Sequence, residues 1–165
     1  MKKLSLLLLL LLPLHAYADW GVFHFKSNDR VWIEGATELP PYPKTENLIP
    51  FQVSSVTRNR YFIDAASINV SQDEVVRYAV VIEATGGAKN VSFEGIRCDT
   101  AERRIYAYGH PDGTWSKAGN ELWDPINFSS GFSYQKALYE DHFCLDRMRV
   151  KNSAEAITNL RRSAQ

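Results

Sequence analysis

The alternation of apolar and polar residues is the clearest signal in the middle of the chain. In VVRYAVVIEA (75–84) every even position is apolar, whereas Arg77 and Glu83 stand at odd positions. A period of two with one apolar face predicts a strand in a sheet that packs on one side and is wetter on the other. Turn residues follow at 85–88, so the segment 89–98 is expected to return antiparallel to this strand.

Shorter segments continue the same pattern. The turn HPDG (110–113) suits a type I turn, with proline second and glycine fourth, and it predicts a further hairpin. In the return strand the apolar residues change parity between Phe93 and Ile96, and a β-bulge at Gly95 is expected to keep both on the core side. The other expected strands are 51–57, 60–64, 66–70 and 102–110. The pattern therefore predicts a mainly antiparallel sheet of about five to seven strands.

Helical spacing of apolar residues enters late in the chain. Between Ser133 and Met148 these residues form one stripe that includes Cys144, so one helix is expected to pack on the sheet. Ser153 is expected to cap a short C-terminal helix over 154–162. Before the first strand, prolines at 40, 41, 43 and 50 remove four backbone donors and predict an extended, proline-rich N-terminal strap. The expected fold class is α+β.

The first 18 residues have the layout of a secretory signal peptide. Two lysines precede a run of leucines, and the small-x-small site AYA ends at Ala18. A transmembrane anchor would need roughly 20 apolar residues, and no cysteine near the cut forms a lipobox. We expect cleavage between Ala18 and Asp19, a periplasmic or secreted protein, and no transmembrane segment in the mature chain. The expected organisation is an N-terminal arm at 19–38, one domain at 39–150 and a C-terminal tail at 151–165.

Charge and cysteine content narrow the function classes. Nineteen basic residues balance nineteen acidic ones, so there is no basic excess for general nucleic-acid binding. The histidines show no ligand spacing and H-E-x-x-H is absent, so neither a metal nor a cofactor is expected. In an oxidising compartment Cys98 and Cys144 are expected to form one structural disulfide. A thiol–disulfide exchanger is the alternative; it usually carries C-x-x-C and requires an exposed cysteine.

Two kinds of site compete in the segment 94–123. An aromatic face is expected to bind a partner if its rings reach solvent, although such rings more often cover a core. The expected binding residues are Tyr106, Tyr108, His110, Trp115 and Trp123. The alternative is a small secreted hydrolase with a histidine–carboxylate pair, for which the able residues are Glu94, His110, Asp112, Asp141 and His142. No nucleophile elbow is present, so no catalytic residue is assigned, and a non-enzymatic binding or structural module is expected, with an envelope protein or a glycan as partner.

Several motifs together carry a resemblance to a known family. They are PPYPK, the strands containing FID and VVRY, NVS-x-EGIRC, YA-x-G-x-x-DGTWS and the final FC, spread over about residues 36–146. The chain resembles the CNP-like (CNP-one-like) family of uncharacterised exported and lipid-anchored proteobacterial proteins. The resemblance implies an envelope domain without a known activity, and its pattern contains both cysteine positions. The missing lipobox cysteine departs from the lipid-anchored members.

Overall fold

The computed structural model describes residues 31–131 and 133–163. The fold described below is that of the compact unit Trp32–Gln165. The expected signal peptide and most of the expected arm at 19–38 lie outside the described residues, so cleavage between Ala18 and Asp19 stays a prediction.

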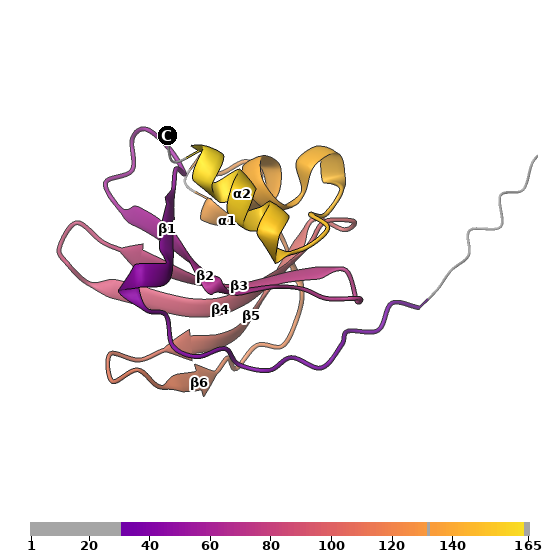
Figure 1. The fold of residues 1–165 in the computed structure, drawn as a ribbon, viewed down its shortest axis with the longest axis horizontal. Coiled ribbons are helices and arrows are strands. Elements are labelled where there is room, and N and C mark those ends of the chain that lie inside the picture. Colours follow the sequence, from indigo (N-terminus) through magenta and orange to yellow (C-terminus); the bar gives the residue numbers. More distant parts are fainter. Residues whose placement is uncertain (1–30, 132, 164–165) are drawn as a thin grey trace, which may run out of the picture. The chain divides into compact units, whose positions relative to one another are not determined.

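The centre of the fold is one antiparallel sheet (Figure 1). Its strands follow the order β1-β2-β3-β4-β5-β6, and β7 pairs with β5 beside β6. The bounds are β1 Leu48–Phe51, β2 Arg60–Val70, β3 Val75–Glu83, β4 Lys89–Arg97, β5 Glu102–Gly109, β6 Trp115–Lys117 and β7 Asp124–Pro125. The expected antiparallel sheet with accompanying helices is thereby confirmed in outline.

Two strand boundaries differ from those expected. The first strand covers 48–51 instead of 51–57, and Pro50 fits there because β1 is an edge strand whose only partner is β2. The expected strands 60–64 and 66–70 are one strand, β2, with an irregular register between Asp64 and Asn69. The turn at 110–113 forms as expected, because Gly113 donates to the His110 carbonyl at 3.0 Å and has a φ of 84°.

Short helices cover one face of the sheet, which we call the first face (Figure 1). They are α1 Tyr134–Ala137, the π-helical η2 Leu138–Phe143, η3 Leu145–Arg147 and α2 Ser153–Ser163, whereas the short η1 Thr45–Asn47 precedes the edge strand β1. The main core lies between these helices and the strands. Its fully buried members include Ile63, Tyr78, Leu138, Phe143 and Leu160. The helix α2 belongs to this core because Ala156 and Leu160 are both fully buried.

The expected single helix from Ser133 to Met148 is wrong. It breaks into α1, η2 and η3, and both Asp146 and Arg147 have positive φ angles. Met148, expected on the buried stripe, is 70% exposed. The expected disulfide is confirmed: Cys98 and Cys144 are bonded with their Cα atoms 5.3 Å apart, and both side chains are buried. The bond joins the end of β4 to the end of η2.

The second face of the sheet is also covered, contrary to the expectation of a wetter side. All residues of β3 from Val75 to Val81 are buried, including Arg77 at 3% exposure. A second apolar cluster lies on this face, formed by Ala79, Phe93, Tyr106 and Ala107 with Trp115 and Trp123 against it. The change of parity in β4 follows from the two covered faces.

The expected bulge at Gly95 is therefore wrong. Residues 89–97 pair regularly with β3, so Phe93 lies on the second face and Ile96 on the first. The irregularity is in β5, where Glu94 pairs with Ile105 and Phe93 pairs with Ala107, leaving Tyr106 as the extra residue. Gly95 has another role: a Cβ atom there would lie 2.9 Å from the Tyr106 hydroxyl oxygen. Glycine thus lets the Tyr106 ring cross β4.

Candidate functional site

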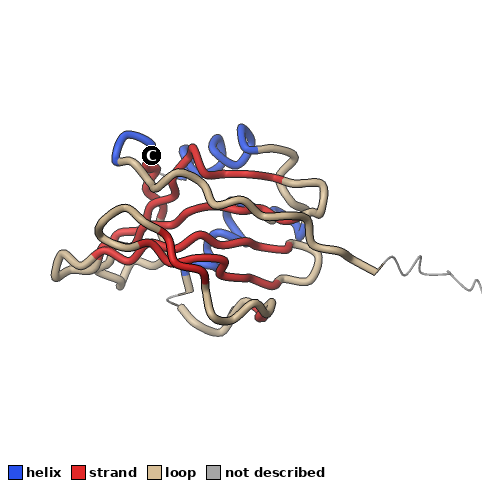
Figure 2. Tube along the Cα trace, turned by 90° about the horizontal axis from the view of Figure 1, so that it is seen from below, coloured by secondary structure: helices blue, strands red, loops and turns tan. Residues whose placement is uncertain are grey.

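The second face is covered by an irregular segment, residues 32–43, which we call the strap (Figure 2). Near its start the Trp32 indole donates to the Asp73 carbonyl at 2.7 Å, and the Gly35 amide donates to the Asp73 carboxylate at 2.8 Å. Near its end the Trp115 indole donates to the Pro40 carbonyl at 3.0 Å. Side-chain and backbone hydrogen bonds therefore hold the strap at both ends, although no sheet ladder includes it.

A carboxylate from the strap lies at the centre of the second face. Glu34 accepts hydrogen bonds from Arg104 at 2.5 Å, from the Tyr106 hydroxyl at 2.7 Å and from the Trp123 indole at 3.1 Å. Arg77 approaches the same carboxylate at 3.6 Å. Charge-assisted hydrogen bonds are stronger than neutral ones, and the Glu34 side chain is only 18% exposed. Three hydrogen-bond donors and the Arg77 cation thus converge on one residue of the strap.

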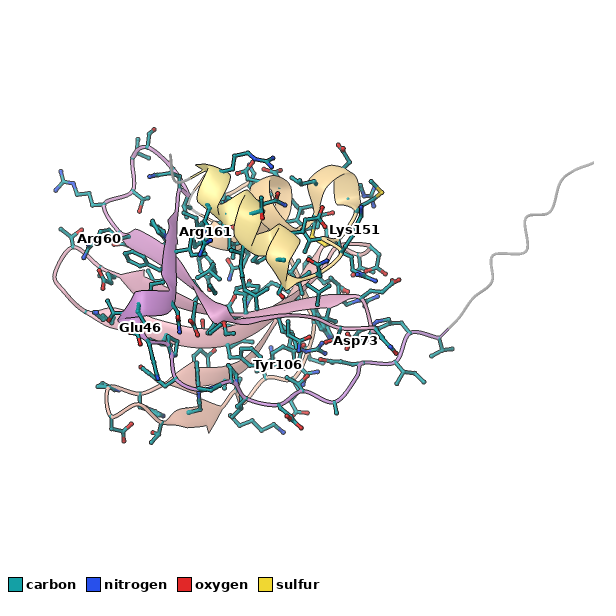
Figure 3. The ribbon with its side chains drawn as sticks, viewed as in Figure 1. Glu46, Arg60, Asp73, Tyr106, Lys151 and Arg161 are labelled. Carbon is teal, nitrogen blue, oxygen red and sulfur yellow. A yellow bond between two sulfur atoms is a disulfide. The ribbon has the colours of Figure 1, made fainter. Side chains whose placement is uncertain are left out.

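Arg77 links this carboxylate to the turn between β2 and β3. Its guanidinium donates to Asp73 at 2.6 Å, to Ser71 at 3.0 Å and to Thr37 of the strap at 2.9 Å. Burial opposes ionisation of Asp73, but the hydrogen bonds from Arg77 and Gly35 outweigh it and lower its pKa. Figure 3 shows Asp73 and Tyr106 along the side of the sheet on which the strap runs. The strap is therefore tied to the sheet by a continuous polar network.

Aromatic rings enclose the network. Trp32 packs edge-on against Trp123 with centroids 5.8 Å apart, and the Arg97 guanidinium lies 3.8 Å from the Trp32 centroid. At the other end Tyr42 packs on Trp115 at 5.4 Å. Burial, followed by the hydrogen bond to Glu34, raises the pKa of Tyr106 far above its ordinary value. Tyr106 is accordingly a neutral donor at any physiological pH.

An open cleft of about 440 Å³ lies between the strap and the outer edge of β5. Its lining includes Glu34, Leu39, Arg104, Tyr106, Ala118 and Glu121. The cleft forms because β6 and β7 pair with different parts of β5, at 107–109 and 102–103, and the segment between them leaves the middle of the strand uncovered. Apolar lining with a few convergent polar groups is characteristic of ligand sites.

The structure separates the expected aromatic binding residues. Tyr106 is buried at 8% exposure under the strap, whereas Tyr108 is 47% exposed and pairs with Ser92 of the first face. The extra residue in β5 separates the two tyrosines, which were expected to share a face. Trp115 and Trp123 are half-buried, and His110 is exposed in the hairpin turn. Of the five, Tyr106 lines the cleft directly, and Trp123 contacts it through Glu34.

Sequence reasoning missed the strap's contribution to this site. Trp32 and Glu34 fell in the segment assigned to an N-terminal arm, and Arg104 was not among the expected site residues, whereas Asp141 was named as a candidate carboxylate for hydrolysis. Asp141 is instead exposed, and Arg104 pairs with Glu34 and more loosely with Glu121. The sequence held a weak signal, because Arg77 and Arg104 both lie within expected strands. If such arginines are buried, a carboxylate from elsewhere in the chain must pair with them.

The histidine–carboxylate pairs considered for hydrolysis do not converge on a common cleft. Asp112 accepts hydrogen bonds from Thr114 within the turn that carries exposed His110. His142 is 1% exposed and packs edge-on against Phe51 in the main core. Burial lowers the pKa of His142 and its Nδ1 has no hydrogen-bond partner. A substrate cannot reach this imidazole without local unfolding.

Glu94 is the remaining carboxylate of that set, and it is completely buried on the first face. It accepts hydrogen bonds from Ser92 and Tyr134, each at 2.6 Å, and from Tyr78 at 3.2 Å. Burial raises its pKa, and the three hydroxyl donors oppose that effect only in part. The arrangement closes one end of the core and offers no route for a substrate.

The raised pKa of Glu94 predicts a pH-dependent stability. In the interval between its unfolded value, about 4.5, and the higher folded pKa, the folded protein binds more protons than the unfolded one. The free energy of unfolding therefore falls as pH rises through that interval. Glu94→Gln is expected to remove this fall, so its stability relative to wild type should increase from pH 4 upward in urea titrations. A constant difference across pH would contradict the assignment.

In residues 31–131 and 133–163 no group of three histidine, cysteine, aspartate or glutamate side chains is placed to hold a metal ion. Within the same ranges no helix has the length and apolarity needed to cross a membrane.

Comparison with known proteins gives one match. The model of the CNP1-like family matches residues 27–161, which include the strap, the sheet and most of α2. No curated protein and no solved structure matches the chain. The family match covers most of the sequence and agrees with the resemblance noted from the motifs. The chain belongs to the CNP1-like family.

Proposed function

We propose that this protein is an exported, non-enzymatic binding module of the cell envelope, and that its ligand binds in the cleft between the strap and β5. The observation that carries the proposal is the 440 Å³ cleft between the strap and the outer edge of β5, where polar and apolar side chains from the strap, β5, β6 and the loop after β6 meet around Tyr106. A site of this size and composition suits a small ligand or a short peptide segment. Export rests on the signal-peptide pattern of residues 1–18.

The polar groups around the cleft favour binding over catalysis. Glu34 is saturated by three donors, Asp73 is held by Arg77, and Tyr106 donates to Glu34. A general base needs a free acceptor within reach of a substrate proton, and these acceptors are engaged. The cleft residues exposed enough to meet a ligand are Leu39, which is 49% exposed, and the rim residues Lys117 and Glu121, which pair with each other at the surface.

Site-specific photo-crosslinking in the periplasm tests this proposal. A photoreactive residue at position 39 is expected to capture a specific partner, because Leu39 is both exposed and part of the cleft lining. Lys117→Glu, which reverses a charge at the rim, should reduce that capture by about threefold or more. The matched control Lys136→Glu changes a lysine on α1, on the first face, and should leave capture unchanged. Equal capture by both variants would contradict the proposed site.

A further inference from the structure

Arg104 has one guanidinium edge that the protein does not use. Its Nη1 atom donates to Glu34 at 2.5 Å. Its Nε atom is buried without a hydrogen-bond partner, and its Nη2 atom reaches only a Glu121 oxygen at 3.9 Å. Buried donors are paired in nearly all native structures, so an orphan donor calls for an explanation. Nε and Nη2 together form the side edge that binds carboxylates in a bidentate manner.

Glu121 approaches the Nη2 end of this edge at 3.9 Å, but its close ion pair is with another residue. Its side chain is 56% exposed and forms its close ion pair with Lys117, four residues earlier. The segment that carries Glu121 lies between β6 and β7, and no sheet pairing includes it. An exposed ion pair contributes little to stability, so displacement of Glu121 from the Arg104 edge costs little. Glu121 therefore occupies the position of an exchangeable acceptor.

The rest of the cleft is suited to an apolar group. Leu39, Ile105, Tyr106 and Ala118 contribute to the lining next to Arg104. Leu39 is 49% exposed, so part of its apolar surface is unpaired in the structure. A ligand that places an anionic group on Arg104 would lay its adjoining apolar part on these side chains and remove them from water.

From these observations we infer that the cleft binds a carboxylate with a short apolar body, as found at the end of a peptide, and that the ligand carboxylate replaces Glu121 beside Nη2 of Arg104 and pairs with the buried Nε once the segment carrying Glu121 moves aside. This inference rests on the proposed binding function and specifies its ligand class. The planar fork favours a carboxylate over an amide, because an amide offers one acceptor oxygen and two donors that face the cation.

The test compares N-acetyl-leucine with N-acetyl-leucinamide on the full chain. Binding is followed by NMR through the backbone amides of Lys117, Ala118 and Glu121. The acid is expected to bind at least about tenfold more tightly than the amide, the equivalent of one charged hydrogen bond. Glu121→Gln removes the competing carboxylate and should tighten acid binding by about threefold to tenfold. The matched control Glu140→Gln, an exposed acid on η2 outside the cleft, should leave it unchanged.

A further variant separates the role of the fork from that of the charge. Arg104→Lys keeps a cation beside Glu34 but has no bidentate edge, so the preference for acid over amide should disappear while urea unfolding still shows a folded protein. The inference is overturned if acid and amide bind equally, if Glu121→Gln fails to tighten acid binding, or if neither compound binds below about 10 mM. Capture at position 39 together with equal binding of acid and amide would leave the binding module intact and reject only the ligand class.

Discussion

Replacing Glu34 with glutamine is expected to lower the free energy of unfolding by about 3 kcal/mol, because two arginines on the second face lose their shared carboxylate. Removal of one partner from a buried ion pair costs roughly 3–5 kcal/mol. The lower end applies because Glu34 and Arg104 retain 18% and 17% exposure. Arg77 keeps its pair with Asp73, so the main loss falls on Arg104 and on the hydrogen bonds of Tyr106 and Trp123.

Urea unfolding of Glu34→Gln and Glu38→Gln measures this effect with its control. Glu38 lies on the same strap but is exposed, and its replacement should change stability by less than about 0.5 kcal/mol. If the two variants have the same stability, the strap is not anchored through Glu34. The second face would then be covered in some other way.

Removal of the disulfide is expected to have the other large effect, a loss of about 4 kcal/mol. The bond joins residues 46 positions apart, and the chain-entropy model gives about 4 kcal/mol for a loop of that length. The Cys98→Ala/Cys144→Ala variant should show this loss in urea unfolding. Loss of the bond also frees the junction between β4 and η2, so amide exchange should accelerate around Phe143.

The control for the urea unfolding of the double variant is the oxidised wild type, unfolded in the same buffer without reductant. Both cysteines are buried, Cys98 at 3% and Cys144 at 2%. Native wild type is therefore expected not to react with maleimide, either before or after treatment with a mild reductant. Rapid reduction of the folded protein would instead support the thiol–disulfide exchanger considered from the sequence. Equal free energies of unfolding for the variant and the oxidised wild type would show that the disulfide does not stabilise the fold.

Alternation along the chain predicted the central strands because each is paired with its neighbour in sequence. The hairpins β3–β4 and β5–β6 need only local pattern and turn residues such as Gly113. The same rule failed at Arg77, which was assigned to a wetter face. It is buried because Thr37 and Glu34, about forty positions earlier, cover it. A period of two reports which residues share a face but not whether a distant segment covers that face.

The errors at Gly95 and in the helical region have similar causes. The bulge at Gly95 assumed that every apolar residue faces one core, and two covered faces remove that need. The stripe from Ser133 to Met148 satisfied helical spacing, yet the chain leaves helical geometry at Cys144, and Asp146 and Arg147 beyond it have positive φ angles. Positive φ angles are uncommon for residues other than glycine, so the residue types at these positions did not predict the end of the helix.

The candidate site was predictable only in part for the same reason. Tyr106 and Trp123 were selected because aromatic residues clustered in the sequence, and both contact Glu34. Glu34 itself belongs to no motif and is one of two acids, with Glu38, in a segment without regular structure. Its role depends on the tertiary position of Arg104, which no local pattern specifies.

Protection of the tryptophan indole N–H groups from hydrogen exchange tests the central claim most directly. The strap places the Trp32 indole on the Asp73 carbonyl, the Trp123 indole on Glu34 and the Trp115 indole on the Pro40 carbonyl. We expect NMR to show all three indole protons protected in wild type, and Glu34→Gln to reduce protection at Trp123 and Trp32 more than at Trp115. Unprotected indoles at Trp32 and Trp123 in wild type, or protection that Glu34→Gln leaves unchanged, would contradict the account that Glu34 fastens the strap to the sheet.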